Sequence, residues 1–252
     1  MNKFVLYPVG SSDSCQYAAI FLTQEGFTLT DHPSPDITHL LLDTPTFNEK
    51  GLLRNGTSLQ ELLRMLPESV TVIGGNLRQD YLCGYRTIDL LQDPYYLAKN
   101  AAITAECALH VAAQHMQATF ADSTALILGW GRIGKCLAKL LSALGCSVTV
   151  AARKESDRAM LESFGYRAVD FSQVPQVLQS HTLLFNTVPA VPLHSDILTN
   201  WSQGVALDLA SDPGMAGTQM IPARGLPGKY APESAGKLIA GTITRFYKEG
   251  TL

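Results

Sequence analysis

The sequence lacks the features that identify disulfide-rich, zinc-binding and membrane-spanning proteins. Its five cysteines are scattered and none stands in a C-x-x-C spacing, so neither a zinc site nor a disulfide framework is expected. No apolar run approaches the roughly 20 residues that span a bilayer. Pro8 interrupts the N-terminal segment too soon for a secretion signal. We therefore expect a cytoplasmic protein without a membrane partner.

Strong charge of one sign is also missing. The 19 Lys and Arg residues nearly balance the 22 Asp and Glu residues, for a net charge of −3, and no long basic run is present. This balance argues against nucleic acid as a partner. The hydrophobic content of 46% suits a folded globular protein, and a length of 252 residues favours two domains.

What the sequence does contain is an alternation of strand-like and helix-like segments, which is typical of parallel sheets. We expect strands at residues 3–9, 38–42, 70–73, 124–128, 147–150, 167–169, 181–185 and 205–209. Helices are expected at residues 13–24, 58–66, 94–116, 132–144, 153–164 and 232–248. The long alanine-rich helix at 94–116 is interpreted as a bridge between two domains.

A glycine-rich loop follows the expected strand at 124–128: residues 129–134 have the sequence Gly-Trp-Gly-Arg-Ile-Gly. Its place between a strand and an amphipathic helix is that of the dinucleotide-binding motif G-x-G-x-x-G. Gly129 would permit the sharp turn, Gly131 would let the backbone approach a pyrophosphate, and Gly134 would let the helix lie close to the strand. The alternative is a turn with incidental glycines. The residues assigned to cofactor binding are Gly129, Gly131, Arg132, Ile133 and Gly134.

The end of the next strand lacks the acidic residue that holds the ribose 2′-hydroxyl in NAD-binding proteins. Ala151 and Ala152 stand there instead, and Arg153 and Lys154 follow at once. A ribose 2′-phosphate requires cations and hydrogen-bond donors rather than a carboxylate. The sequence therefore favours NADP over NAD as the cofactor. The alternative is that the two cations belong to a solvated helix start.

Two further loops follow strands, at positions where open α/β sheets bind ligands. Residues 186–189 have the sequence Asn-Thr-Val-Pro, and residues 210–214 have the sequence Ala-Ser-Asp-Pro-Gly. Asn186 and Ser211 are candidate catalytic-site residues, with hydrogen bonds to a substrate carboxylate or the nicotinamide carboxamide, and turn chemistry is the alternative. Asp208 is expected to cap the second turn. The cofactor-binding candidates are Thr187, Val188, Pro189 and Ala210.

Several stretches together resemble the A subunits of the dipicolinate synthases of spore-forming bacteria, with order and spacing that hold over about residues 70–245. They are Gly129-Trp-Gly-Arg-Ile-Gly134, Ala152-Arg153, Asn186-Thr-Val-Pro189, Asp208-Leu-Ala-Ser211, Pro213-Gly214, Gly225-Leu-Pro-Gly228, Ala231-Pro232 and Ala235-Gly236, with residues 100–106 upstream. The stretches from Asp208 onward are more specific than the glycine loop. Residues 1–69 match only loosely.

The resemblance implies a two-domain α/β fold like that of the D-2-hydroxyacid dehydrogenases. One domain would be a Rossmann doubly wound parallel sheet, and the other a smaller flavodoxin-like α/β domain. Residues 1–93 would form the N-terminal domain for substrate or partner, with a C-terminal helix at 232–249 packing back onto it. Residues 94–231 would form the Rossmann NADP-binding domain, including the bridging helix.

The resemblance also implies NADP-linked oxidation of a small dicarboxylate substrate, dihydrodipicolinate or its hydroxylated precursor, to pyridine-2,6-dicarboxylate. The family partner is the flavoprotein-like B subunit of dipicolinate synthase, and a homo-oligomer is expected. Aromatisation supplies much of the driving force, so orientation and a modest base would suffice. Glu106, on an otherwise apolar stretch, is the candidate catalytic base, with helix capping or interhelical hydrogen bonding as the alternative. Arg224, Lys229 and the backbone N–H groups of residues 74–76 are candidates for binding the substrate carboxylates.

Two other functions stay open. A D-2-hydroxyacid or shikimate-type dehydrogenase would require a catalytic His or a Lys–Asp pair, and no residue can be assigned to that role. A non-catalytic regulatory protein would bind NADP without turnover, and the loose match of residues 1–69 keeps this alternative open. No metal is expected, because His110 and His115 lie five residues apart and do not share a helix face.

Overall fold

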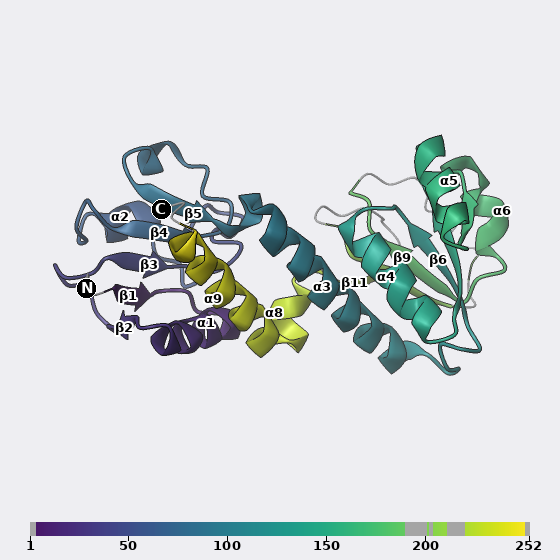
Figure 1. The fold of residues 1–252 in the computed structure, drawn as a ribbon, viewed down its shortest axis with the longest axis horizontal. Helices are drawn as coiled ribbons and strands as arrows, with labels where there is room; N and C mark the ends of the chain where they lie inside the picture. Colours follow the sequence, from purple (N-terminus) through teal and green to yellow (C-terminus); the bar gives the residue numbers. More distant parts are fainter. Residues whose placement is uncertain (1–3, 190–200, 202–203, 211–219, 250–252) are drawn as a thin grey trace. The chain divides into compact units, whose positions relative to one another are not determined.

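The structure, a computed structural model, consists of two compact units (Figure 1). It describes residues 4–189, 201, 204–210 and 220–249. Unit 1 comprises Met1–Asn100 together with Pro227–Leu252, and unit 2 comprises Ala101–Leu226. Each unit has its own parallel sheet with helices on its faces.

The division between the units falls inside two helices, α3 (Pro94–His115) and α8 (Leu226–Tyr230). The sequence suggests a boundary at the first residue of α3, whereas the first turns of this helix belong to unit 1. The physical reason is Tyr96, which is buried in the unit 1 core together with Leu6 and Ile239.

Unit 1 is built on a sheet whose order, within the described residues, is β2-β1-β3-β4-β5. Its strands are β1 (Val5–Pro8), β2 (Thr28–Leu29), β3 (His39–Leu41), β4 (Thr71–Gly74) and β5 (Arg86–Asp89). Its helices are α1 (Asp13–Gln24), α2 (Leu59–Leu63), α9 (Pro232–Lys248) and the short 3-10 helices η1 (Asp80–Leu82) and η2 (Leu90–Gln92). All strand pairs are parallel, and the order is that of flavodoxin. The predicted flavodoxin-like α/β domain is confirmed.

The two faces of this sheet carry two separate cores, because successive side chains of a strand point to opposite faces. Leu6 and Leu41 are buried on the face that α1 and α9 cover. Leu40 and Val72 are buried on the other face, together with Leu62 of α2. Burial on both sides explains why the central strands β3 and β4 consist mainly of apolar residues.

The C-terminal helix α9 lies along α1 within unit 1 (Figure 1). Their contact is close: a Cβ at Gly236 would lie 2.5 Å from Cβ of Tyr17 and 2.8 Å from the carbonyl oxygen of Ser14. Near the end of α9, the hydroxyl of Tyr247 is hydrogen-bonded to Nε2 of His39 on β3. The last helix of the chain is therefore part of the core of unit 1.

Unit 2 is built on a larger parallel sheet, in the order β11-β10-β9-β6-β7-β8 over the described residues. Its strands are β6 (Thr124–Leu128), β7 (Ser147–Ala151), β8 (Arg167–Val169), β9 (Leu183–Asn186), β10 (Val205–Asp208) and β11 (Met220–Pro222). Its helices include α4 (Arg132–Ala143), α5 (Glu155–Ser163), η3 (Phe171–Gln173) and α6 (Val174–Leu178). Counted within the unit, the order is the Rossmann order 3-2-1-4-5-6, so the predicted doubly wound sheet is confirmed.

The described part of the chain carries neither a candidate membrane span nor a cluster of metal ligands. There, no helix combines the length and the apolarity that a bilayer crossing requires. Among the same residues, no three His, Cys, Asp or Glu side chains gather as metal ligands would. All the cysteines are free thiols, with Cys83 exposed and Cys15, Cys107 and Cys146 buried.

Candidate dinucleotide-binding site

The glycine loop joins β6 to α4, and the fold itself requires two of its glycines. Gly129 has a φ of 104°, in the left-handed region that favours glycine. A Cβ at this position would also lie 2.7 Å from Oγ1 of Thr187 and from Cγ1 of Val188. A Cβ at Gly134 would lie 2.2 Å from the carbonyl oxygen of Gly129. Glycine at 129 is therefore required by the turn and by the neighbouring segment after β9, and glycine at 134 by the close approach of α4 to the loop.

Gly131 differs from the other two glycines because nothing in the fold requires it. Its φ of −82° is open to any residue, its surface is exposed, and a Cβ would meet no atom within 4 Å. A remaining physical reason for glycine is the approach of a ligand to the backbone, as the motif predicts. Gly131 is therefore the residue that distinguishes a ligand-binding loop from a turn with incidental glycines.

Helix α4 begins next to Gly131 without a side-chain cap. The first N–H groups of an α-helix have no partner inside the helix, and here they belong to Arg132, Ile133 and Gly134. The partial positive charge of a helix N-terminus favours an anion at this point. The loop therefore offers both space and hydrogen-bond donors to a phosphate group.

A pocket of about 350 Å³ lies beside the glycine loop, where β6, β7 and β9 end. The sequence-predicted residues that line it are Gly129, Gly131, Arg153, Lys154, Val188 and Pro189. Trp130, Ala152, Asp157 and Phe171 also line it. Thr187 lies just behind, with its Oγ1 donating to the carbonyl oxygen of Leu128 at 2.8 Å. Three loops that are distant in sequence thus meet at the carboxyl edge of the sheet.

The loop that carries the two predicted cations is held by Arg158, which the sequence analysis did not identify. Nη1 of Arg158 donates to the carbonyl oxygens of Arg153 and of the preceding residue, both at 2.8 Å. It also donates to Oδ2 of Asp170 at 3.0 Å. Hydrogen bonds from the backbone and hydroxyl of Ser172, with Arg158 nearby, lower the pKa of Asp170. The guanidinium of Arg153 lies 5.7 Å from the ring centroid of Phe171.

The charges around the pocket have both signs. Arg153 and Lys154 are exposed and suit a ribose 2′-phosphate. Asp157, half-buried in the first turn of α5, also lines the pocket, and a carboxylate suits the ribose 2′-hydroxyl of NAD. The lining therefore combines groups that favour NADP with one that favours NAD.

The side chain of Asn186 stabilises, through hydrogen bonds, the turn that contains it. Its Nδ2 donates to Oδ1 of Asp208 at 2.9 Å and to the carbonyl oxygen of Val188 at 3.2 Å, and its Oδ1 accepts from the N–H of Val188. Asn186 is fully buried, so direct contact with a substrate is not what the structure shows. Asp208 accepts from the N–H of Ala210 at 3.2 Å, which confirms the predicted cap. Ala210 is buried.

Glu106 is exposed on α3, so the apolar environment that its sequence neighbours suggest is absent. The helical period explains the difference, because Ala105 and Ala108 are buried while Glu106 faces solvent. Its charge nevertheless reaches α4: burial raises the pKa of Cys136, and Glu106 adds to that rise. Ser211 lies outside the described residues.

The backbone N–H groups proposed to bind a substrate carboxylate are placed differently from expectation. The N–H of Gly75 donates to Oγ1 of Thr46 and the N–H of Asn76 to Oδ1 of Asp89, each at 3.0 Å. These N–H groups are therefore engaged within the protein, which corrects the expectation that a ligand would use them. Arg224 and Lys229 are both exposed.

Two signals in the sequence could have identified Arg158 and Asp170, which the sequence analysis did not name. Arg158 lies four residues after Lys154, so one turn of helix brings its side chain back to the loop. Asp170 directly follows β8, at the same carboxyl edge where the other loops meet. Neither signal specifies that the two side chains pair with each other, since that depends on the spacing of two strands.

Most of the described part of unit 2 matches the model of a known protein family. Residues 98–200 match the family described as D-isomer specific 2-hydroxyacid dehydrogenase, NAD binding domain. The match includes the glycine loop, the loop that Arg158 holds, and Asn186. Unit 2 is therefore similar to the NAD-binding domain of these dehydrogenases, and this similarity supports a nicotinamide dinucleotide as its cofactor.

The individual proteins to which the chain is similar include dipicolinate synthase A subunits. It is 30% identical over 159 residues to the A subunit of dipicolinate synthase from Bacillus subtilis (strain 168). That alignment covers 60% of this chain and 54% of the relative, so the chain spans about half the length of the curated relative.

Two solved structures have the same fold over nearly all of the chain. The A subunit of dipicolinate synthase from Bacillus halodurans aligns with a TM-score of 0.82 and 23% identity, over 98% of both chains. The corresponding protein of Bacillus subtilis aligns with a TM-score of 0.81 and 22% identity, over 98% of this chain and 96% of that one. At these identities the likeness shows the fold.

Proposed function

We propose that the chain is an NADP-dependent oxidoreductase that acts as the A subunit of a dipicolinate synthase. It would oxidise dihydrodipicolinate, or its hydroxylated precursor, to pyridine-2,6-dicarboxylate. The observation that carries the cofactor assignment is Gly131, a glycine that the fold does not require, beside an uncapped helix and a pocket. The similarity to the A subunit of Bacillus subtilis dipicolinate synthase supports the substrate assignment.

The pocket residues fit the parts of an NADP molecule. We assign the pyrophosphate to the backbone at Gly131 and the first turn of α4, where donors and positive potential coincide. Arg153 and Lys154 would hold the ribose 2′-phosphate, because both cations are exposed at the pocket wall. Val188 and Pro189 would line the nicotinamide end, with Thr187 and Ala210 supporting them from behind.

The proposed reaction removes a hydride and a proton from a dihydropyridine ring and leaves an aromatic ring. NADP, when bound, supplies the hydride acceptor. The chain has to orient the ring and accept the proton. We assign the proton to Glu106, an exposed carboxylate close enough to α4 to affect Cys136. Ser211 would donate a hydrogen bond to a substrate carboxylate, and Asn186 would hold the adjacent loop in place.

A second candidate reaction is the oxidation of a simple 2-hydroxyacid, which the family match at residues 98–200 favours. It requires the same cofactor but a different substrate, so a substrate comparison separates the two. We also propose a partner, the flavoprotein-like B subunit of dipicolinate synthase, since the similar proteins are named as A subunits. A homo-oligomeric state belongs to the same proposal.

The test is a turnover assay with the purified full chain, NADP and freshly generated dihydrodipicolinate, without and with the B subunit. Formation of NADPH and of pyridine-2,6-dicarboxylate is followed by absorbance, and equal amounts of both are expected. Replacing NADP by NAD should slow the reaction, and D-lactate in place of dihydrodipicolinate should give no NADPH. The control variant is Gly131→Val, which should fold normally and give neither product.

Tight NADP binding with neither product, even with the B subunit, would contradict the proposed reaction and favour the regulatory alternative. NADPH formed from D-lactate alone would favour the 2-hydroxyacid reaction. If both products form, Glu106→Gln should lower kcat about 100-fold without changing the affinity for NADP, as expected for loss of a general base.

A further inference from the structure

The strand order of unit 1 marks a second place where a ligand would bind. In the order β2-β1-β3-β4-β5, the direction of winding reverses between β1 and β3. Open α/β sheets bind their ligands at this switch point, outside the carboxyl ends of the strands. In unit 1 the switch point is formed by the turn between β1 and α1, which contains Ser11 and Ser12, and by Asp43, shortly after β3.

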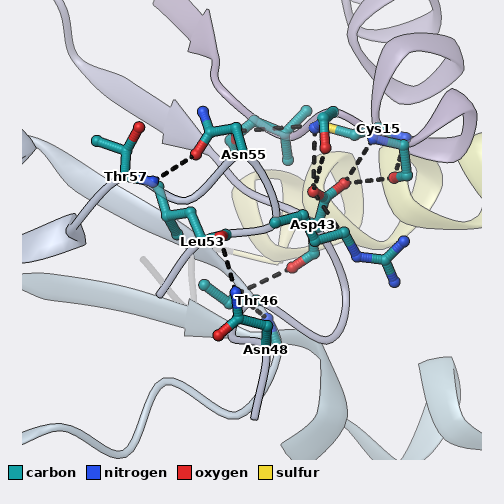
Figure 2. A network of polar contacts seen from close by, with 12 residues as sticks. Cys15, Asp43, Thr46, Asn48, Leu53, Asn55 and Thr57 are labelled. Carbon is teal, nitrogen blue, oxygen red and sulfur yellow. Dashed lines mark hydrogen bonds and ion pairs between the residues drawn. The ribbon is translucent and has the colours of Figure 1, made fainter. Parts of the chain in front are cut away.

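The switch point is closed on one side by Asp43, which is 4% exposed. Its carboxylate accepts from the N–H of Ser11 at 3.0 Å and from the N–H of Ser12 at 2.9 Å, and both serine hydroxyls donate to it as well. Figure 2 shows Asp43 bound to this turn, close to Cys15. Burial, with the charge of Asp43 adding to it, raises the pKa of Cys15 to about 12, so the thiol is not a reactive group. The carboxylate of Asp43 therefore stabilises the turn and is not available to bind a ligand.

The group at the switch point that keeps unused hydrogen-bonding capacity is Arg54. Its Nε lies 3.9 Å from Oδ2 of Asp43, and its side chain is 48% exposed. Within the described residues, Nη1 and Nη2 of Arg54 make no hydrogen bond or ion pair. The guanidinium is therefore held beside Asp43 through one edge, while its other donors stay available.

The loop that carries Arg54 is ordered by its own hydrogen bonds, so the guanidinium is presented in a defined place. Oδ1 of Asn48 accepts from the N–H groups of Lys50 and Leu52, and Oδ1 of Asn55 accepts from the N–H of Thr57. Leu53, which precedes Arg54, is buried in the core of unit 1. Figure 2 shows Asn48, Leu53 and Asn55 on this loop, near Asp43.

We propose that Arg54 binds a carboxylate group of the substrate at the β1–β3 switch point of unit 1. A planar guanidinium with two adjacent free nitrogens matches a carboxylate with two parallel hydrogen bonds. The exposed Ser11, whose N–H and hydroxyl both donate to Asp43, belongs to the same hydrogen-bond network. This inference rests on the proposed function, in which the substrate and product each carry two carboxylates.

The test is calorimetric titration of the full chain, saturated with NADP, with pyridine-2,6-dicarboxylate. We expect Arg54→Gln to weaken binding about 10- to 100-fold, the usual effect of losing charge-assisted hydrogen bonds. Arg54→Lys, which keeps the charge but loses the planar donor pair, should have an intermediate effect. The matched control is Arg64→Gln, another exposed arginine of unit 1, which should bind as the wild type does. The affinity for NADP and the Tm report whether the variants fold.

The outcomes separate this inference from the proposed function. Wild-type turnover with an unchanged dicarboxylate affinity in Arg54→Gln would overturn the assignment of Arg54 alone. Dicarboxylate binding that depends on Arg54, without turnover, would support the site and contradict the proposed reaction. If the wild-type protein neither binds the dicarboxylate nor turns over, both proposals are overturned.

Discussion

The β1–α1 turn of unit 1 and the β6–α4 turn of unit 2 hold equivalent positions, since each leads from a central parallel strand into a helix of twelve residues. In unit 2 the turn has no side-chain cap and faces a pocket. In unit 1, Ser12 caps the helix and Asp43 accepts the N–H groups of the turn. The same element is thus open to a ligand anion in one unit and closed by an internal carboxylate in the other.

This difference shows how one topology serves two purposes. A phosphate site needs backbone donors without partners and a glycine that allows approach. Once an aspartate fills the same position, the turn becomes rigid and a ligand must be held by another group at its rim. In unit 1 that group is the half-exposed Arg54, whose assignment to the substrate remains our proposal.

The largest expected effect comes from removing the internal carboxylate. Asp43→Ala should destabilise the protein by about 4 kcal/mol, because two N–H groups, two hydroxyls and Arg54 lose a buried partner at once. Urea unfolding measures the change, and Ser11→Ala should cost less than about 1 kcal/mol. An Asp43→Ala variant as stable as the wild type would show that the turn of unit 1 does not depend on this carboxylate.

Acid should affect unit 1 through His39. Burial, with the charge of Arg86 adding to it, lowers the pKa of His39 to about 4, whereas an unfolded His titrates near 6.5. The unfolded state therefore binds the proton more readily, and stability falls as the pH drops from about 6.5 towards 4. The expected loss is about 2 kcal/mol at pH 5.

Urea unfolding of the wild type and of His39→Gln at pH 7.5, 6 and 5 measures this contribution. The variant should be less stable at pH 7.5, because the bond between His39 and Tyr247 is altered, but its stability should change less with pH. His181 in unit 2 also has a pKa lowered by burial, so a residual dependence on pH is expected. Parallel profiles for the two proteins would contradict the assignment to His39.

The glycines of unit 2 should respond differently to the same substitution. Gly134→Ala should cost about 2 kcal/mol, because its Cβ would lie 2.2 Å from a backbone oxygen that cannot move freely. Gly131→Ala meets no atom within 4 Å and should leave the Tm within a few degrees of the wild-type value. Equal losses of stability in the two variants would mean that Gly131 also has a structural role.

The smallest effect concerns the loop that presents Arg153 and Lys154. Arg158→Gln removes the bonds to two carbonyl oxygens and to Asp170, so the loop should lose its fixed position. We expect the NADP affinity to fall about tenfold relative to the NAD affinity. Titration with both cofactors measures the ratio, and a merely structural role would weaken both equally.

Much of the fold could be predicted from the sequence, because its main elements carry local patterns. The strand at 124–128, the strand at 167–169 and the helix at 232–248 have the predicted bounds in the structure. The missed strands β2 and β5 have few buried side chains, so no apolar run marks them. Such strands exist because a neighbouring strand pairs with them, which is not a local property.

The candidate site likewise has features that the sequence predicts and features that depend on tertiary structure. The glycine loop was predictable, because the spacing of its glycines between a strand and a helix is a local pattern of the sequence. The pair Arg158–Asp170 was not, because it joins α5 to the segment after β8, and the pair Arg54–Asp43 was not, because it depends on how the long connection between β3 and α2 folds back on itself. The burial of Asn186 and the exposure of Glu106 depend on packing around them, and a sequence pattern alone left both roles open.

The contrast between the two turns is tested most directly by calorimetric titration of NADP into the wild type, Gly131→Val and Asp43→Asn. The account predicts one site per chain, lost or weakened at least 100-fold in Gly131→Val, whose Tm should stay near the wild-type value, and unchanged in Asp43→Asn. NADP binding that survives Gly131→Val, or that depends on Asp43, would contradict the assignment of the dinucleotide to the open turn of unit 2.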